Sequence, residues 1–139
     1  MDTNILLDAA MSERPGWAAA TLLMDEFAFG AAEGYVAASS LKDVYYVLSK
    51  YASEPDARAF IIAVMDLFKI GAVDEALCRM SALSDEPDYE DGLIRACAER
   101  IPVDCIISRD ERAFLTSPIR RLSAQEYLDL FCEVETIDL

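Results

Sequence analysis

The stretch Val103–Asp110, VDCIISRD, combines a short apolar segment with an acidic residue shortly after it, a pattern that recurs along this chain. Its apolar and β-branched core, residues 103–107, has the composition of a buried β-strand. Asp110 follows directly, at the start of a predicted helical turn over 110–114. Short apolar runs of this kind alternate with longer helical patterns along the chain, which is typical of an α/β domain with a parallel sheet.

The remaining elements fit the same organisation. Further strands are predicted over 34–38 and 119–122, with a brief extended stretch at Val73. The helices carry recognisable start and stop signals, such as a proline or a capping residue at the start and a glycine after the end. They are predicted over 15–29, 41–51 (capped by Ser39 and Ser40), 55–69, 76–83 (capped by Asp74) and 87–100, with a last helix after the capping box 123–126.

Length and composition predict one domain over residues 1–139 with a substantial core, since 54% of the residues are hydrophobic. No apolar run reaches membrane-spanning length, and the start of the chain lacks the pattern of a signal peptide. We therefore expect a cytoplasmic protein with no membrane partner.

The residue inventory narrows the possible chemistry. The chain has no histidine, and its four cysteines are scattered, which excludes the usual zinc frameworks and histidine-based triads. The net charge of −14 argues against a large positively charged surface for binding nucleic acid, but it is compatible with cation binding. Any catalysis must therefore use carboxylates, hydroxyls, Lys or Arg, or a hard metal ion.

Four aspartates occupy similar positions relative to the predicted elements, either just after a strand or in the first turn of a helix. They are Asp2, Asp43, Asp91 and Asp110. Each alone could be a helix cap or a favourable charge at a helix N-terminus. Together they would meet at the carboxyl edge of a parallel sheet and repel one another unless a cation lay among them. Mg²⁺ or Mn²⁺ prefers such oxygen ligands and can activate water, so the pattern favours metal-dependent hydrolysis of a phosphodiester.

These residues stand in segments that resemble the PIN-domain family, the nuclease fold of VapC-type toxins. The segments DTNILLDA, SSLKDVYYVLSK, DYEDGLIRACAER and VDCIISRDERAF resemble the four acidic motifs of that family in the right order. The closing IRRLSAQEYL is similar to its last strand and helix. The resemblance therefore covers nearly the whole chain.

The resemblance implies a three-layer α/β/α sandwich with a mainly parallel five-stranded sheet. It implies that Asp2, Asp43, Asp91 and Asp110 are the catalytic, metal-binding acids, with Mg²⁺ or Mn²⁺ as cofactor. Asn4 would orient Asp2 and Ser108 would help to hold the site. The implied activity is that of an endoribonuclease acting on RNA, forming a homodimer and, as a toxin, inhibited by a cognate antitoxin.

Two departures from the family pattern shape these expectations. Only Met1 precedes Asp2, although the family carries its first acid at the end of a central strand. We therefore expect either a truncated first strand, with Asp2 the most loosely held of the four acids, or a reading frame that begins upstream. The acidic surface leaves Arg109 and Arg112 as the candidate contacts for substrate phosphate. A catalytically silent PIN-like binding or assembly module is the alternative function.

Overall fold

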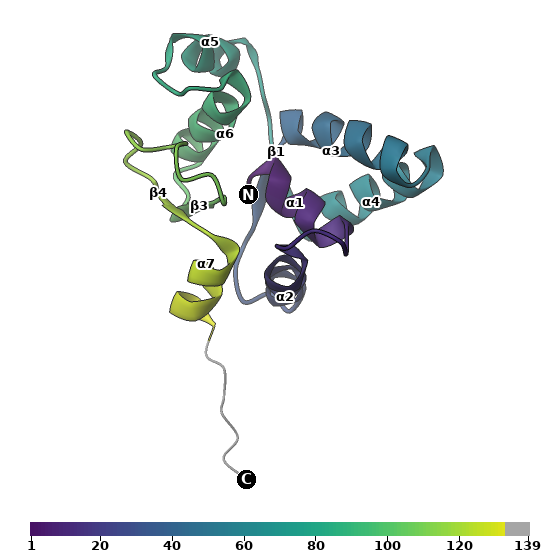
Figure 1. Cartoon of the computed structure of the whole chain (residues 1–139). Coiled ribbons are helices and arrows are strands. Elements are labelled where there is room, and N and C mark those ends of the chain that lie inside the picture. The colour runs from purple at the N-terminus through teal and green to yellow at the C-terminus, as the bar shows by residue number, and fades with distance from the viewer. Residues whose placement is uncertain (133–139) are drawn as a thin grey trace.

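The computed structural model describes residues 1–132 (Figure 1). Helices and short strands alternate along the chain, as the sequence predicts. In order they are α1 (Thr3–Ala10), α2 (Trp17–Ala28), β1 (Tyr35–Ala37), α3 (Ala38–Tyr51), α4 (Glu54–Leu67), β2 (Lys69–Gly71), α5 (Glu75–Leu83), α6 (Tyr89–Arg100), β3 (Cys105–Ile107), β4 (Arg120–Leu122) and α7 (Ala124–Phe131). None of these helices is long and apolar enough to cross a membrane.

The strands pair in parallel, as expected for an α/β fold. β1 pairs with β2, with Tyr35 opposite Lys69, and the helices α3 and α4 make the crossover between them. β3 pairs with β4, with Cys105 opposite Arg120. Within residues 1–132 these are two separate two-stranded sheets, whereas the resemblance to the PIN-domain family implies a single five-stranded sheet.

The N-terminal residues lie between the two strand pairs and bridge them. The amine of Met1 donates a hydrogen bond to the carbonyl oxygen of Tyr35 in β1, at 2.8 Å. The backbone N–H of Asp2 donates to the carbonyl oxygen of Ile107 in β3, at 2.9 Å. Helix α1 then begins at Thr3.

Consecutive strand residues point into different parts of the core, as a pleated strand between two helical layers requires. Ile107 packs with buried residues of α1, α2 and α7, whereas its neighbour Ile106 packs with buried residues of α5 and α6. In β1, Val36 joins the apolar residues of α1, α3 and α4, and Ala37 joins those of α5 and α6. The helices therefore cover both faces of the strands, and α3 with α4 and α5 with α6 form two packed pairs (Figure 1).

Several predicted helix starts are confirmed by their hydrogen bonds. The side chain of Asp74 accepts from the backbone N–H of Leu77 and caps α5. Ser123 and Glu126 form the complete capping box at the start of α7. In each case a side-chain oxygen satisfies an N–H group that the first helical turn leaves without an intrahelical partner.

Other predicted boundaries are wrong. Helix α3 begins directly after β1, so Ser39 and Ser40 lie in its first turn and do not cap it. The segment 69–71, predicted as a helix end followed by a glycine stop, is strand β2. Residues 110–114 form turns in place of the predicted helical turn. Strand β2 was missed because strand pairing over three residues leaves little trace in the local sequence.

Candidate active site

Asp2 is held at the carboxyl end of β3 by a buried serine. Asp2 occupies the N-cap position of α1, but its side chain makes no capping hydrogen bond. Its Oδ2 atom instead accepts a hydrogen bond from the hydroxyl of Ser108, at 2.6 Å. Asp2 is only 4% exposed and Ser108 is fully buried. Burial raises the pKa of Asp2, while the Ser108 hydrogen bond partly opposes that rise. Asp2 is thus firmly held, and the expectation of a loose N-terminal acid is wrong.

Asp110 lies beside Asp2 because both depend on the turn that follows β3. The hydroxyl oxygen of Ser108 accepts from the backbone N–H of Asp110 at 3.1 Å, and Arg121 donates to the carbonyl oxygen of Ser108 at 2.8 Å. The Oδ1 atom of Asp110 accepts from the backbone N–H of Arg112 at 2.9 Å. The negative charge of Asp110 contributes to the raised pKa of Asp2, so the two carboxylates lie within electrostatic reach.

Asp91 joins these two acids from the first turn of α6. Its position is fixed by Asp88, whose side chain caps the helix by accepting from the backbone N–H groups of Glu90 and Asp91. Burial raises the pKa of Asp91 to about 7, followed in effect by the charges of Asp2, Asp88, Asp110 and Glu86. Three of the four predicted acids therefore share one electronegative site.

Asp43, the fourth predicted acid, is not among the charges that chiefly raise the pKa values of Asp2 and Asp91. It projects from α3 and forms an ion pair with Lys42 at 2.8 Å, and the Lys42 ammonium also lies 3.9 Å from Glu90. The pKa of Glu90 is raised by burial and then by the charge of Asp43, which places Asp43 against the start of α6. Asp43 therefore lies beside Glu90, whereas the charges of Asp2 and Asp110 act on Asp91 directly.

Sequence reasoning missed a buried carboxylate at this site, that of Glu86. Its side chain is only 2% exposed and lies 3.2 Å from the guanidinium of Arg95. Both of its oxygens accept from the backbone N–H of Phe114, at 3.0 and 3.1 Å. Phe114 has a left-handed backbone with φ of 66°, so this hydrogen bond helps to hold a strained turn. Glu86 stands in an acid-rich segment, and nothing local distinguishes it from its solvated neighbours.

A second buried acid, Asp8, was also missed and changes the role expected for Arg109. Asp8 is 2% exposed and lies 3.2 Å from Arg109 and 3.4 Å from Arg14. Arg109 is therefore partly committed to this ion pair. Arg112 remains exposed next to Asp110. Asn4 lies on the exposed side of α1, and no hydrogen bond among residues 1–132 joins its side chain to Asp2.

The donor set fits a hard divalent cation in its chemistry. All the converging groups are carboxylates or a hydroxyl, which are the oxygen ligands that Mg²⁺ and Mn²⁺ prefer. A bound cation would favour the ionised forms of Asp2 and Asp91, whose pKa values are raised first by burial and then by neighbouring carboxylates. Among residues 1–132, however, no three acidic or cysteine side chains already stand close enough to hold an ion. Binding would therefore require the carboxylates to close around the cation.

Comparison with known protein families gives a match that covers most of the chain. The sequence model of a family described as "PIN domain" matches residues 1–112, which include all four predicted acids and Ser108. No curated protein and no solved structure matches the chain.

Proposed function

Because the chain belongs to the PIN-domain family, whose members are commonly nucleases, we propose that it is a metal-dependent endoribonuclease that hydrolyses RNA phosphodiesters. The observation that carries this proposal is the convergence of Asp2 and Asp110 on Ser108, with Asp91 close enough that burial and the charges of these acids raise its pKa to about 7. A fold rarely gathers carboxylates that oppose one another's ionisation unless a cation or a proton is part of their task.

Asp2, Asp91 and Asp110 would hold the metal ion, with Asp43 supporting them from the side of Glu90. Bound Mg²⁺ or Mn²⁺ would supply an activated water and stabilise the charge of the phosphoryl transition state. Ser108 fixes the Asp2 carboxylate through its 2.6 Å hydrogen bond and so sets the orientation of one ligand. The turn after β3 holds Asp110 and leaves the Arg112 side chain exposed to contact a substrate phosphate.

Cleavage of RNA in the presence of Mn²⁺ by wild type and by Asp91→Asn tests the activity. We expect the variant to lose about 10²-fold or more, because it removes a metal ligand without changing the size of the side chain. Asp66→Asn is the matched control, since Asp66 is an exposed carboxylate on α4. Equal cleavage by wild type and Asp91→Asn would contradict the proposal.

The similarity of the motifs to VapC-type toxins extends the proposal to the biological role. The nuclease would act as the toxin of a toxin–antitoxin pair, as a homodimer restrained by an antitoxin protein. Expression of wild type should then arrest the growth of a bacterial host, whereas Asp91→Asn should not. Normal growth at matched expression levels would exclude the toxin role while leaving the nuclease activity to be judged by the cleavage assay.

One observation favours a second candidate, a catalytically silent binding or assembly module. The acids among residues 1–132 approach one another without forming a completed metal cage. Thermal melting with and without millimolar Mn²⁺ separates the two candidates, because a ligand that binds only the folded state raises the melting temperature. A clear rise that Asp91→Asn abolishes supports the nuclease, and no rise supports the silent module.

A further inference from the structure

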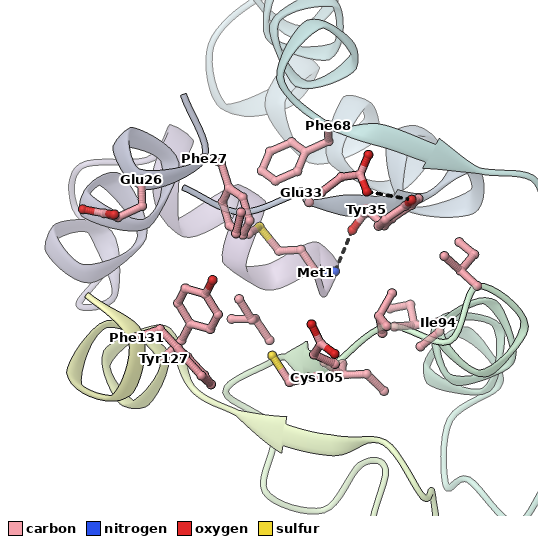
Figure 2. A pocket seen from close by; sticks show the side chains of 18 of the residues that line it. Met1, Glu26, Phe27, Glu33, Tyr35, Phe68, Ile94, Cys105, Tyr127 and Phe131 are labelled. Atoms are coloured by element: carbon pink, nitrogen blue, oxygen red, sulfur yellow. Dashed lines mark hydrogen bonds between the residues drawn. The ribbon is translucent and has the colours of Figure 1, made fainter. Parts of the chain in front are cut away.

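A cavity of about 880 Å³ lies between β1 and β3, beside the nitrogen of Met1 (Figure 2). It is lined mainly by apolar and aromatic side chains, such as Phe27, Phe68 and Tyr127, and none of the four predicted acids is among the described residues that line it. The cavity is therefore not part of the acidic site. A nucleic acid that reaches the acids must be held by side chains on the surface around them.

Three exposed side chains of α3 form a ridge that begins beside the acids. Lys42, Tyr46 and Lys50, here called the α3 ridge, recur at intervals of four residues, so they lie along one side of the helix over about 12 Å. At the first end, the Lys42 ammonium lies 2.8 Å from Asp43 and 3.9 Å from Glu90 at the start of α6. From there α3 leads away from the helix pair α5 and α6 (Figure 1).

At the other end of the ridge, Lys50 carries a positive charge that no carboxylate among residues 1–132 pairs with. Most basic side chains of the chain do form such pairs, as Lys42 does with Asp43 and Lys69 with Glu33. The Lys50 ammonium instead donates a hydrogen bond to the hydroxyl of Tyr46, at 2.6 Å, and lies 4.1 Å from the centre of the tyrosine ring. In a chain with 26 acidic and 12 basic residues, this end of the ridge is a place where an anionic ligand meets a cation.

Tyr46 adds a second feature, which points to a nucleic acid. Its side chain is 60% exposed, and its hydrogen bond with Lys50 helps to hold the ring in place on the surface. Surfaces that bind RNA strands combine cations that contact phosphates with aromatic rings on which bases stack. An acidic protein segment could pair with the lysines, but it has no planar base to cover the ring. The charge and the exposed ring together therefore favour an RNA strand.

We propose that the α3 ridge is the part of the RNA-binding surface on the α3 side of the acids, where a base stacks on Tyr46 and a backbone phosphate contacts Lys50. Arg112 is the corresponding contact on the β3 side, since its backbone holds Asp110. The RNA strand would then pass from Arg112 across the acids to α3. This inference rests on the proposed function, because it takes RNA as the substrate.

RNA binding by the inactive Asp91→Asn protein tests this surface without requiring cleavage. The probe is a labelled single-stranded RNA of about twelve nucleotides, and binding is followed by fluorescence anisotropy with Mg²⁺ present. Tyr46→Ala should weaken binding about tenfold, because it removes the stacked ring. Lys50→Gln should reduce the slope of log affinity against log salt concentration by about 0.7, which is the contribution of one phosphate contact in a single strand.

Two residues outside the ridge provide matched controls. Tyr51 is an exposed tyrosine on another side of α3, where it donates to Glu13, and Lys69 is an exposed lysine on β2. Tyr51→Ala and Lys69→Gln should leave both the affinity and the salt slope unchanged. Ultraviolet cross-linking of the bound RNA, followed by peptide mass spectrometry, should place an adduct on Tyr46 and none on Tyr51.

An unchanged affinity of Tyr46→Ala, or an unchanged salt slope of Lys50→Gln, would overturn the proposal, as would the absence of RNA binding at low salt. A polyglutamate peptide of the same charge serves as competitor. If it displaces the RNA as effectively as unlabelled RNA does, the ridge binds an acidic protein and the proposal is wrong.

Failure of the nuclease activity would give a different result. Wild type that binds RNA through Tyr46 and Lys50 without cleaving it would support the ridge and exclude the nuclease. Cleavage at low RNA concentration that Tyr46→Ala and Lys50→Gln both leave unchanged would support the nuclease and overturn the role of the ridge.

Discussion

Asp91→Asn should stabilise the metal-free protein at pH 8 and, at the same time, abolish its response to metal. The pKa of Asp91 is about 7 against an ordinary value of 3.8, so the folded protein holds this proton more tightly than the unfolded chain does. Between those two values the folded state binds more protons, and stability therefore falls as the pH rises from about 4 to about 7. Above pH 7 the ionised Asp91 opposes folding in full, and asparagine removes that opposition.

The size of the effect follows from the same shift. The difference between 3.8 and about 7, at roughly 1.36 kcal/mol per pH unit, sets a ceiling of about 4 kcal/mol. Asp91 is only partly buried, and solvent and salt screen its repulsion from Asp2 and Asp110. We therefore expect Asp91→Asn to raise the free energy of unfolding at pH 8 by about 1–2 kcal/mol over wild type.

Urea unfolding in EDTA at pH 5 and pH 8 measures this difference. The advantage of Asp91→Asn over wild type should be smaller at pH 5 and larger at pH 8, whereas the control Asp66→Asn should follow wild type at both. With Mn²⁺ at about a hundred times its dissociation constant, wild type should gain about 2.7 kcal/mol and overtake the variant. A variant that is less stable than wild type at pH 8 without metal would refute this account of Asp91.

Three further predictions concern the groups around the acids. Ser108→Ala should lower the free energy of unfolding in urea by about 2 kcal/mol, because Asp2 stays buried without its hydrogen bond. The same change should weaken Mn²⁺ binding measured by calorimetry. An unchanged Mn²⁺ affinity would contradict the role of Ser108 in positioning Asp2. Glu86→Gln should lower the pKa of Asp91, seen by carboxyl-carbon NMR titration, since it removes one of the charges that raise it; an unmoved titration would show that Glu86 is electrostatically silent. In the inactive Asp91→Asn background, Arg112→Ala should weaken RNA binding and reduce the slope of log affinity against log salt concentration by about 1. The control Arg58→Ala, on α4, should change neither quantity. Equal effects of the two substitutions would mean that the RNA binds away from Arg112.

The alternation of strands and helices was predictable because it rests on local signals. Capping residues such as Asp74 and Ser123 satisfy helix N–H groups within a few residues of themselves, so the sequence window contains the whole interaction. The positions of Asp91 and Asp110 were predictable for the same reason, because Asp91 lies just after a recognisable helix start and Asp110 follows a recognisable strand. Their convergence with Asp2 could be expected because the carboxyl ends of parallel strands meet at one edge of the fold.

What could not be predicted depends on partners far apart in the chain. Glu86 is buried because it receives the N–H of Phe114, and Asp8 because it meets Arg109, and neither pairing leaves a local pattern. Strand β2 was missed for a related reason: it is defined by its pairing with β1 rather than by its own composition.

The division of the strands into two pairs also explains the arrangement of the four acids. Asp2 and Asp110 are tied to the β3 side through Ser108, and Asp91 reaches them from α6. Asp43 projects from α3, which follows β1, and so belongs to the other strand pair. The backbone bridge at Met1 and Asp2 is a direct link between these two sides. The distance from Asp43 to the other acids therefore depends on the spacing of the two strand pairs.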